Sequence, residues 1–146
     1  MRYKRILTVL IILTVTFIWG NSLLPPEASW AVSNAVKEVI LALLPGEGGS
    51  GGAGTFGSLL RKMAHFTEFC VLGGLLRAQW KGRKNEIFMP LFLGLLTAVI
   101  DETIQAFTGR TSSVFDVWID FSGVIIGTAL ITGWFYWLKG HRSKFK

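Results

Sequence analysis

The sequence predicts an all-α integral membrane protein with four transmembrane helices and a short amphipathic helix in the first outer loop. Of its 146 residues, 51% are hydrophobic and 16% are charged, and the apolar residues are gathered into long runs. A chain of this length fits one domain, so residues 1–146 are expected to form a single membrane domain. Lys and Arg are concentrated at the chain ends and in one loop rather than interleaved with aromatic residues, which argues against nucleic acid as a partner.

The first apolar run, about residues 6–24, follows three basic residues and has the opening of either a signal peptide or a first membrane helix. It can cross the roughly 30 Å hydrocarbon core only if it continues to Leu24. Ser29–Ala31 is a poor match to a small-x-small cleavage site, and Pro25 and Pro26 cannot donate helical hydrogen bonds. A retained helix that ends at the prolines is therefore favoured over a cleaved signal peptide.

The pattern changes between residues 29 and 44, where apolar residues recur at three- and four-residue steps. This spacing predicts an amphipathic helix that lies along the interface or packs on the other helices. The following segment 46–57, GEGGSGGAGTFG, is expected to be a flexible linker. A phosphate-binding loop is disfavoured there because the GK[ST] signature is absent and no strand precedes it.

Three further apolar segments predict membrane spans at about residues 59–78, 87–107 and 114–138. Three Lys and Arg residues precede the first span, four (Arg77, Lys81, Arg83 and Lys84) lie from the end of the second span to the start of the third, and four follow the fourth. Because cytoplasmic loops carry the excess of basic residues, both termini are expected to be cytoplasmic.

Two blocks of polar residues interrupt the apolar spans. The first block contains Arg61, Lys62, His65 and Glu68. The second contains Asp101, Glu102, Gln105, Arg110, Asp116 and Asp120. Gly123 and Gly127 continue the acidic stripe of the last span at a spacing that lets helix backbones approach closely. Ionisable groups are costly at membrane depth, so we expect the two blocks to meet in one pocket at the outer face.

Three functions are open for such a pocket. The first is a structural clamp in which ion pairs hold the helices together. The second is a binding site for a charged or phosphorylated lipid-linked or peptide ligand, with Arg61, Lys62 and Arg110 as anion contacts. The third is an enzyme in which His65 and a carboxylate act as general acid and base, a divalent metal being a variant of that idea.

The catalytic candidates are His65, Glu68, Asp101 and Glu102. The sequence contains no metal motif of defined spacing and no nucleophile elbow, so we expect neither a metal nor another cofactor, and the enzyme is the least favoured of the three. Cys70 is the only cysteine and falls in an apolar run, which predicts a small buried hydrophobe.

The two blocks also carry patterns at fixed spacing. RKMAHFTEFCVLG contains K-x-x-H-F-x-E, and IDETIQAFTGRTSSVFDVWIDFSGVIIG contains D-E-x-x-Q followed by Arg, Asp and two glycines. From Leu59 to Ile131 the chain thereby resembles the VanZ-like family of bacterial membrane proteins. It departs from many relatives at Ile104, where they carry His, and at Asp120, where they carry Asn. The matching positions are Lys62, His65, Glu68, Asp101, Glu102, Gln105, Arg110, Asp116, Gly123 and Gly127.

The resemblance implies a multi-pass protein of the bacterial plasma membrane and cell envelope. Because the family takes its name from a protein associated with teicoplanin resistance, it also implies an effect on glycopeptide susceptibility, exerted by binding a charged envelope lipid or ligand. The partners that it implies are membrane lipid and a lipid-linked envelope precursor or a glycopeptide.

Overall fold

The computed structural model describes residues 2–25, 53–110 and 112–143, together with the positions 31, 34, 35, 38 and 39. Within them the chain forms four helices and no strand: α1 (Arg2–Ser22), α3 (Ala53–Trp80), α4 (Phe88–Phe107) and α5 (Val114–Ser143). The amphipathic helix predicted over 29–44 is, apart from those separate positions, outside the described residues. So is the predicted glycine-rich linker up to residue 52, whereas α3 begins at Ala53, inside the predicted linker.

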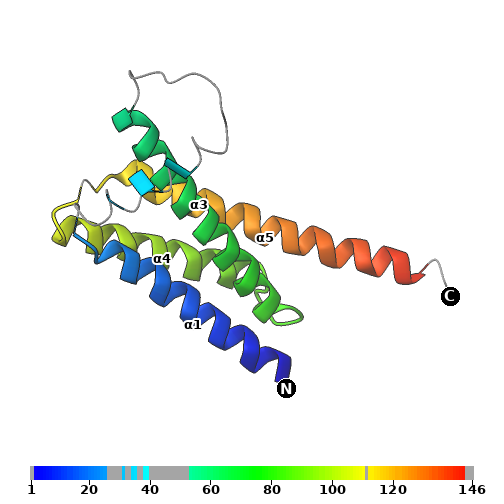
Figure 1. Cartoon of the computed structure of the whole chain (residues 1–146). Helices are drawn as coiled ribbons and strands as arrows, with labels where there is room; N and C mark the ends of the chain where they lie inside the picture. The colour runs from blue at the N-terminus through cyan, green and yellow to red at the C-terminus, as the bar shows by residue number, and fades with distance from the viewer. Residues whose placement is uncertain are drawn as a thin grey trace.

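Consecutive described helices run in opposite directions, and both α3 and α4 contact all the other described helices, with the most extensive contact between α3 and α5. Figure 1 shows the start of α1, the turn from α3 to α4 and the end of α5 toward one end of the molecule. The end of α1, the start of α3 and the turn from α4 to α5 lie toward the other end. Both blocks of polar residues therefore come to this second end, because they lie in the first half of α3, the last turns of α4 and the first turns of α5.

Among the described residues, three helices are long and apolar enough to cross a membrane: Arg2–Ser22, Phe88–Phe107 and Val114–His141. Their large apolar side chains are mostly exposed, as in Phe17 (62%), Leu13 (59%) and Phe88 (62%). Apolar surface of this extent is expected where helices face lipid rather than water. The structure thus supports a membrane protein.

The second predicted span, 59–78, lies within α3, which is not among the three candidate spans. The physical reason is its composition, because Arg61, Lys62 and Glu68 interrupt the apolar run and lower its hydropathy. A membrane-crossing α3 therefore stays a prediction.

The backbones of α3 and α5 lie in direct contact. A Cβ atom at Gly127 would overlap the carbonyl oxygen of Cys70, and a Cβ at Gly73 would overlap the backbone of Val124. A Cβ at Gly123 would lie 2.5 Å from the carbonyl oxygen of the facing turn of α3. Small residues allow this close approach, which gains van der Waals contact along two helices in an apolar environment. The buried core beside this contact consists of Ile18, Phe69, Leu72, Leu76, Ala98 and Val124.

At the opposite end of the molecule, the buried side chain of Arg77 connects two segments. The sequence suggests only a basic residue near a loop at this position. Arg77 Nε donates to the Thr132 hydroxyl at 2.8 Å, and its Nη2 lies 3.4 Å from Glu86 Oε1. The other Glu86 oxygen accepts a hydrogen bond from Gly82 N–H at 2.7 Å, and Gly82 has a φ of +72° that favours glycine. This network connects the turn after α3 to α5.

Candidate functional site

Helix α3 carries its polar residues on the stripe that faces the core. Phe69 and Leu72 are fully buried, and His65 lies one turn before Phe69, so it is buried with them at 6% exposure. Glu68 is half-buried, and its Oε2 lies 3.9 Å from His65 Nδ1. The apolar spacing that makes α3 pack on its neighbours thus directs these two side chains inward.

Helix α4 presents three polar residues at the end of its own buried stripe. Asp101 is fully buried, while Glu102 and Gln105 are 6% and 5% exposed. Gln105 Nε2 donates to Asp101 Oδ2 at 2.8 Å, across one helical turn. Because Ala98 is also fully buried, the core contact of α4 continues directly into this polar group.

The turn after α4 brings Arg110 to the same group of polar residues. Gly109 has a φ of +73°, a left-handed conformation that costs glycine little, and the Arg110 N–H bonds to the Gln105 carbonyl at 3.1 Å. This is the 6→1 hydrogen bond of a Schellman turn. The Arg110 guanidinium is buried at 7% exposure and donates from Nη1 to the carbonyl of Asn21 at 3.1 Å.

The start of α5 is fixed by Ser113, which caps the helix as expected for a serine before an apolar helix. Its hydroxyl accepts a hydrogen bond from Phe115 N–H at 3.2 Å. Its own N–H donates to Glu102 Oε2 at 3.0 Å. Glu102 therefore connects α4 to the beginning of α5, and this sets the position of the acidic residues that follow.

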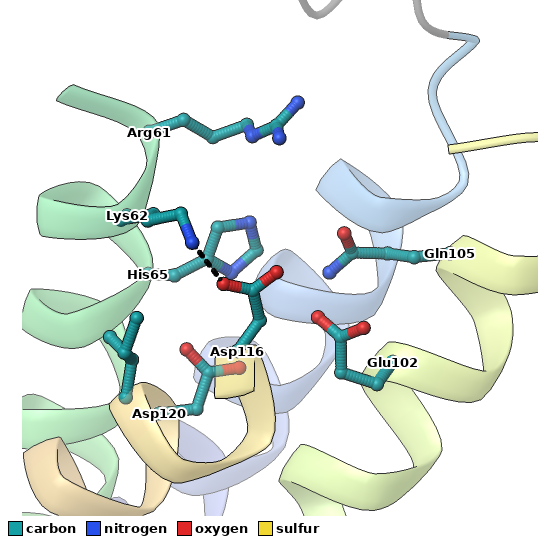
Figure 2. A pocket seen from close by; sticks show the side chains of 8 residues that line it. Arg61, Lys62, His65, Glu102, Gln105, Asp116 and Asp120 are labelled. Carbon is teal, nitrogen blue, oxygen red and sulfur yellow. Dashed lines mark hydrogen bonds and ion pairs between the residues drawn. The ribbon is translucent and has the colours of Figure 1, made fainter. Parts of the chain in front are cut away.

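Acidic residues of α5 meet the polar residues of α3 and α4. Asp116 Oδ1 accepts a charge-assisted hydrogen bond from Lys62 Nζ at 2.5 Å (Figure 2). Asp120, one turn further, is 2% exposed. His65 Nδ1 lies 3.8 Å from Asp101 Oδ2, and one ligand-type atom from each of His65, Asp101 and Asp120 lies within 4.8 Å of the other two.

Several buried polar atoms at this site have no hydrogen-bond partner among the described residues. They are both ring nitrogens of His65, Glu68 Oε2, Asp101 Oδ1, and Nε and Nη2 of Arg110. Buried polar groups are nearly always paired, so each exception calls for an explanation such as a ligand, an ion or ordered water. The unpaired atoms include both donors and carboxylate acceptors.

Arg110 lies close to a second cation. Burial lowers the pKa of its guanidinium, and repulsion from Arg61 lowers the pKa further, whereas Asp101 and Glu102 raise it. An arginine remains protonated in spite of such shifts. Two guanidinium groups that repel each other at the edge of the site would be stabilised by an anion between them.

The residues enclose a small pocket, with Arg61 extending across its upper side in Figure 2. The space that it encloses is about 20 Å³, which is room for a water molecule or one ion but not for a larger ligand. Its lining comes from α3, α4 and α5: Arg61, Lys62, His65, Glu102, Gln105, Asp116, Ile119 and Asp120.

A larger apolar groove lies between α1 and α3. Its volume is about 850 Å³, and its lining includes Leu13 and Phe17 from α1 and Met63 and Ala64 from α3. Glu68 also lines it and is the one carboxylate there. Because Glu68 Oε2 is 3.9 Å from His65, the groove and the polar pocket meet at this side chain.

The structure brings together all ten polar residues that the sequence singled out, with the glycine contact of α3 and α5 directly below. Arg61 and Lys62 lie at the outer edge, the Asp116 carboxylate pairs with Lys62, and the others lie deeper. The sequence did not single out Asn21 as a partner of Arg110, nor the apolar groove. Arg110 contacts the backbone carbonyl of Asn21, which any residue would present, so the sequence contains no signal for this contact.

Comparison with known proteins gives one match. A family model described as VanZ/LLP1 matches residues 7–137 of the 146-residue chain. Neither the curated proteins nor the solved structures include a match to this chain. The matched range extends from α1 to near the end of α5 and includes every residue of the site.

Proposed function

Because the chain belongs to the VanZ/LLP1 family, we propose that it is an integral protein of the bacterial plasma membrane that binds an anionic lipid of the cell envelope at its outer face. The phosphate-bearing headgroup lies at the mouth of the polar pocket, and an acyl or prenyl chain lies in the groove between α1 and α3. In this arrangement α3 is a fourth span, whose charged residues face the pocket and the headgroup layer instead of lipid tails.

The observation that carries this proposal is that Nε and Nη2 of the buried Arg110 side chain have no hydrogen-bond partner among the described residues. A clamp that only held the helices together would be expected to pair its charges internally, as Lys62 and Asp116 do. Here a buried guanidinium keeps two of its nitrogen atoms without a partner, beside a second guanidinium. That combination favours an anionic ligand over a purely structural role.

The size of the pocket determines where a headgroup would lie. A phosphate does not fit into about 20 Å³, so it would bind above His65, where Arg61 extends across the opening. Arg61 is half-buried and makes no hydrogen bond or ion pair with any other described residue. A guanidinium of this kind is suited to bidentate contact with phosphate oxygens.

The groove between α1 and α3 explains why the ligand would be a lipid rather than free phosphate or a peptide. It is almost wholly apolar, opens at the surface that faces lipid, and reaches the polar cluster at Glu68. An acyl chain would fill it while the headgroup remained at the arginines. Binding would then require both an anionic head and a long tail.

Binding is tested with purified protein in detergent, by native mass spectrometry with phosphatidylglycerol and phosphatidylcholine of the same chain length. We expect retention of phosphatidylglycerol but not of phosphatidylcholine, and Arg61→Gln should reduce retention at least about fivefold, which corresponds to about 1 kcal/mol. The matched control is Arg83→Gln, since Arg83 follows α3 at the other end and lies over the Trp80 ring. Equal retention of the two lipids by the wild type would contradict the proposal.

The groove is tested by filling it. Ala64→Phe should weaken binding of long-chain phosphatidylglycerol and leave a water-soluble short-chain analogue unaffected, because only the tail would lose its place. Ala129→Phe is the control, since Ala129 is exposed on α5 and does not line the groove. If Ala64→Phe binds the long-chain lipid as the wild type does, the tail does not occupy this groove.

The same variants separate binding from catalysis and relate it to glycopeptide susceptibility. Lipid recovered with unchanged mass supports binding, whereas a changed product would support the enzyme with His65 as its acid or base.

In cells, expression of the wild type should change teicoplanin susceptibility, and Arg61→Gln at equal protein abundance should abolish the change. An unchanged susceptibility with the wild type would remove the antibiotic role but not lipid binding.

A further inference from the structure

We propose that His65, Asp101 and Asp120 form a binding site for one divalent transition-metal ion, of the type of Zn²⁺ or Mn²⁺. The proposal is independent of lipid binding, since it concerns the deepest part of the polar cluster, below Arg61 and Lys62. It also differs from the expectation drawn from the sequence, in which no spacing indicates a metal, because each ligand comes from a different helix.

The donor atoms lie close together and are available. One atom from each of the three side chains lies within 4.8 Å of the other two, and His65 Nδ1 is 3.8 Å from Asp101 Oδ2. Metal bonds of roughly 2.0–2.2 Å to nitrogen and oxygen place two ligands of a tetrahedral ion about 3.3–3.6 Å apart. Movements of some tenths of an ångström at His65 and Asp101, and somewhat more at the widest pair, would therefore complete the site.

Burial and missing partners distinguish this group from an ordinary acidic cluster. His65, Asp101 and Asp120 are 6%, 0% and 2% exposed. Among the described residues, both imidazole nitrogens and Asp101 Oδ1 lack a hydrogen-bond partner, and Asp120 makes no hydrogen bond or ion pair. The buried Ser22 hydroxyl, which also lacks a partner, is the polar neighbour of the Asp101 carboxylate from α1. Carboxylates buried without partners are costly, and a cation bound between them would offset that cost.

The glycine contact of α3 and α5 holds two of the ligands at this distance. Gly123 lies three residues after Asp120 and abuts the carbonyl oxygen of Phe66, the residue next to His65. The close approach of the two backbones thus fixes the separation of Asp120 from His65 before any metal binds. On α4, Gln105 donates to Asp101 Oδ2 and orients that carboxylate. A hydrogen bond of this kind is typical support for a ligating carboxylate.

The donor set selects the class of ion. An imidazole nitrogen with two carboxylate oxygens suits Zn²⁺, Mn²⁺ or Fe²⁺, whereas Mg²⁺ and Ca²⁺ prefer oxygen ligands alone. Three protein ligands leave at least one coordination position open, and the pocket of about 20 Å³ beside His65 and Asp120 has room for a water molecule there.

The test is elemental analysis of tag-free protein, stripped with chelator in detergent, incubated with Zn²⁺ or Mn²⁺ and freed of excess metal. We expect one equivalent per chain in the wild type and a loss of at least tenfold in affinity in Asp120→Asn and His65→Gln. A control, His141→Gln, should retain one equivalent, because the His141 ring packs on the Trp137 ring near the end of α5, away from the three ligands. Wild-type protein that takes up no metal would overturn the proposal, as would unchanged affinity in His65→Gln.

A second measurement guards against loss of the fold in the variants. Co²⁺ bound to the wild type should give visible absorption bands that report on nitrogen and oxygen ligands, and excess Zn²⁺ should abolish them. The bands should be absent in Asp120→Asn that elutes as a single species with wild-type helicity. Identical Co²⁺ bands in that variant would exclude Asp120 as a ligand. Neither measurement uses lipid, so failure here leaves the lipid-binding proposal standing.

Discussion

Lys62 and His65 lie on the same side of α3, yet their surroundings are opposite. The Lys62 side chain is 38% exposed and forms an ion pair with Asp116 at 2.5 Å. His65 is buried and has no hydrogen-bond partner among the described residues. The first residue therefore contributes to joining α3 with α5, whereas the second is available for a ligand. We therefore expect the Lys62–Asp116 ion pair to contribute to the free energy of unfolding. We expect no such contribution from hydrogen bonding by His65.

A double-mutant cycle on Lys62 and Asp116 checks this assignment. Lys62→Met, Asp116→Leu and the double variant should show a coupling of about 0.5 to 1 kcal/mol in the free energy of unfolding, because the pair is partly exposed and partly screened. The measurement is unfolding by SDS in mixed micelles at low salt. A coupling of zero would mean that the short ion pair adds nothing to the association of α3 with α5.

The sequence could predict which polar residues gather but not how they pair. Ionisable residues in apolar runs must face inward, and that rule predicted that nine ionisable side chains and Gln105 beside them gather in one cluster. The structure pairs Lys62 of α3 with Asp116 of α5, 54 positions away. Pairing across helices depends on their relative rotation, and no single-sequence pattern contains that rotation.

At the scale of helices, the contact of α3 with α5 determines the geometry of the site. The sequence predicted close packing of Gly123 and Gly127 against a neighbour without identifying the neighbour or its Gly73. The three glycines lie where a Cβ atom would meet backbone atoms of the facing helix, which cannot move aside as a flexible side chain could. Substitution there would separate the helices and the ligands above them.

Gly127→Ala tests this contact against Gly133→Ala as a matched control. A Cβ at Gly127 would overlap the Cys70 carbonyl, so we expect a destabilisation of about 1 to 3 kcal/mol. A Cβ at Gly133, on the same helix, meets nothing within 4 Å, and alanine should leave stability unchanged or raise it by up to about 1 kcal/mol. Unfolding in mixed micelles measures both. Equal stability of the two variants would show that α3 and α5 can move apart at little cost in free energy.

For the whole molecule, the distribution of Lys and Arg residues agrees with the directions of the helices. The start of α1, the turn from α3 to α4 and the end of α5 lie toward one end, and these segments carry most of the Lys and Arg residues. The polar site is toward the other end. The sequence predicted this division from the number of basic residues in each loop, whereas the structure does not include α3 among the helices apolar enough to be candidate spans. A helix of this composition can cross lipid when its polar side chains are covered by neighbouring helices, as the side chain of His65 is here.

Cysteine labelling in intact cells tests the membrane orientation that this distribution of basic residues predicts. In a Cys70→Ala background, Gly49→Cys should react with a membrane-impermeant maleimide added from outside, and Ser143→Cys should react only after the cells are opened. The reason is that Gly49 precedes α3 and Ser143 ends α5, so a membrane-crossing α3, α4 and α5 place the two positions on opposite sides. Labelling of Ser143→Cys but not Gly49→Cys from outside would invert the topology. Labelling of both from outside would mean that an even number of spans separates them and that α3 does not cross the membrane.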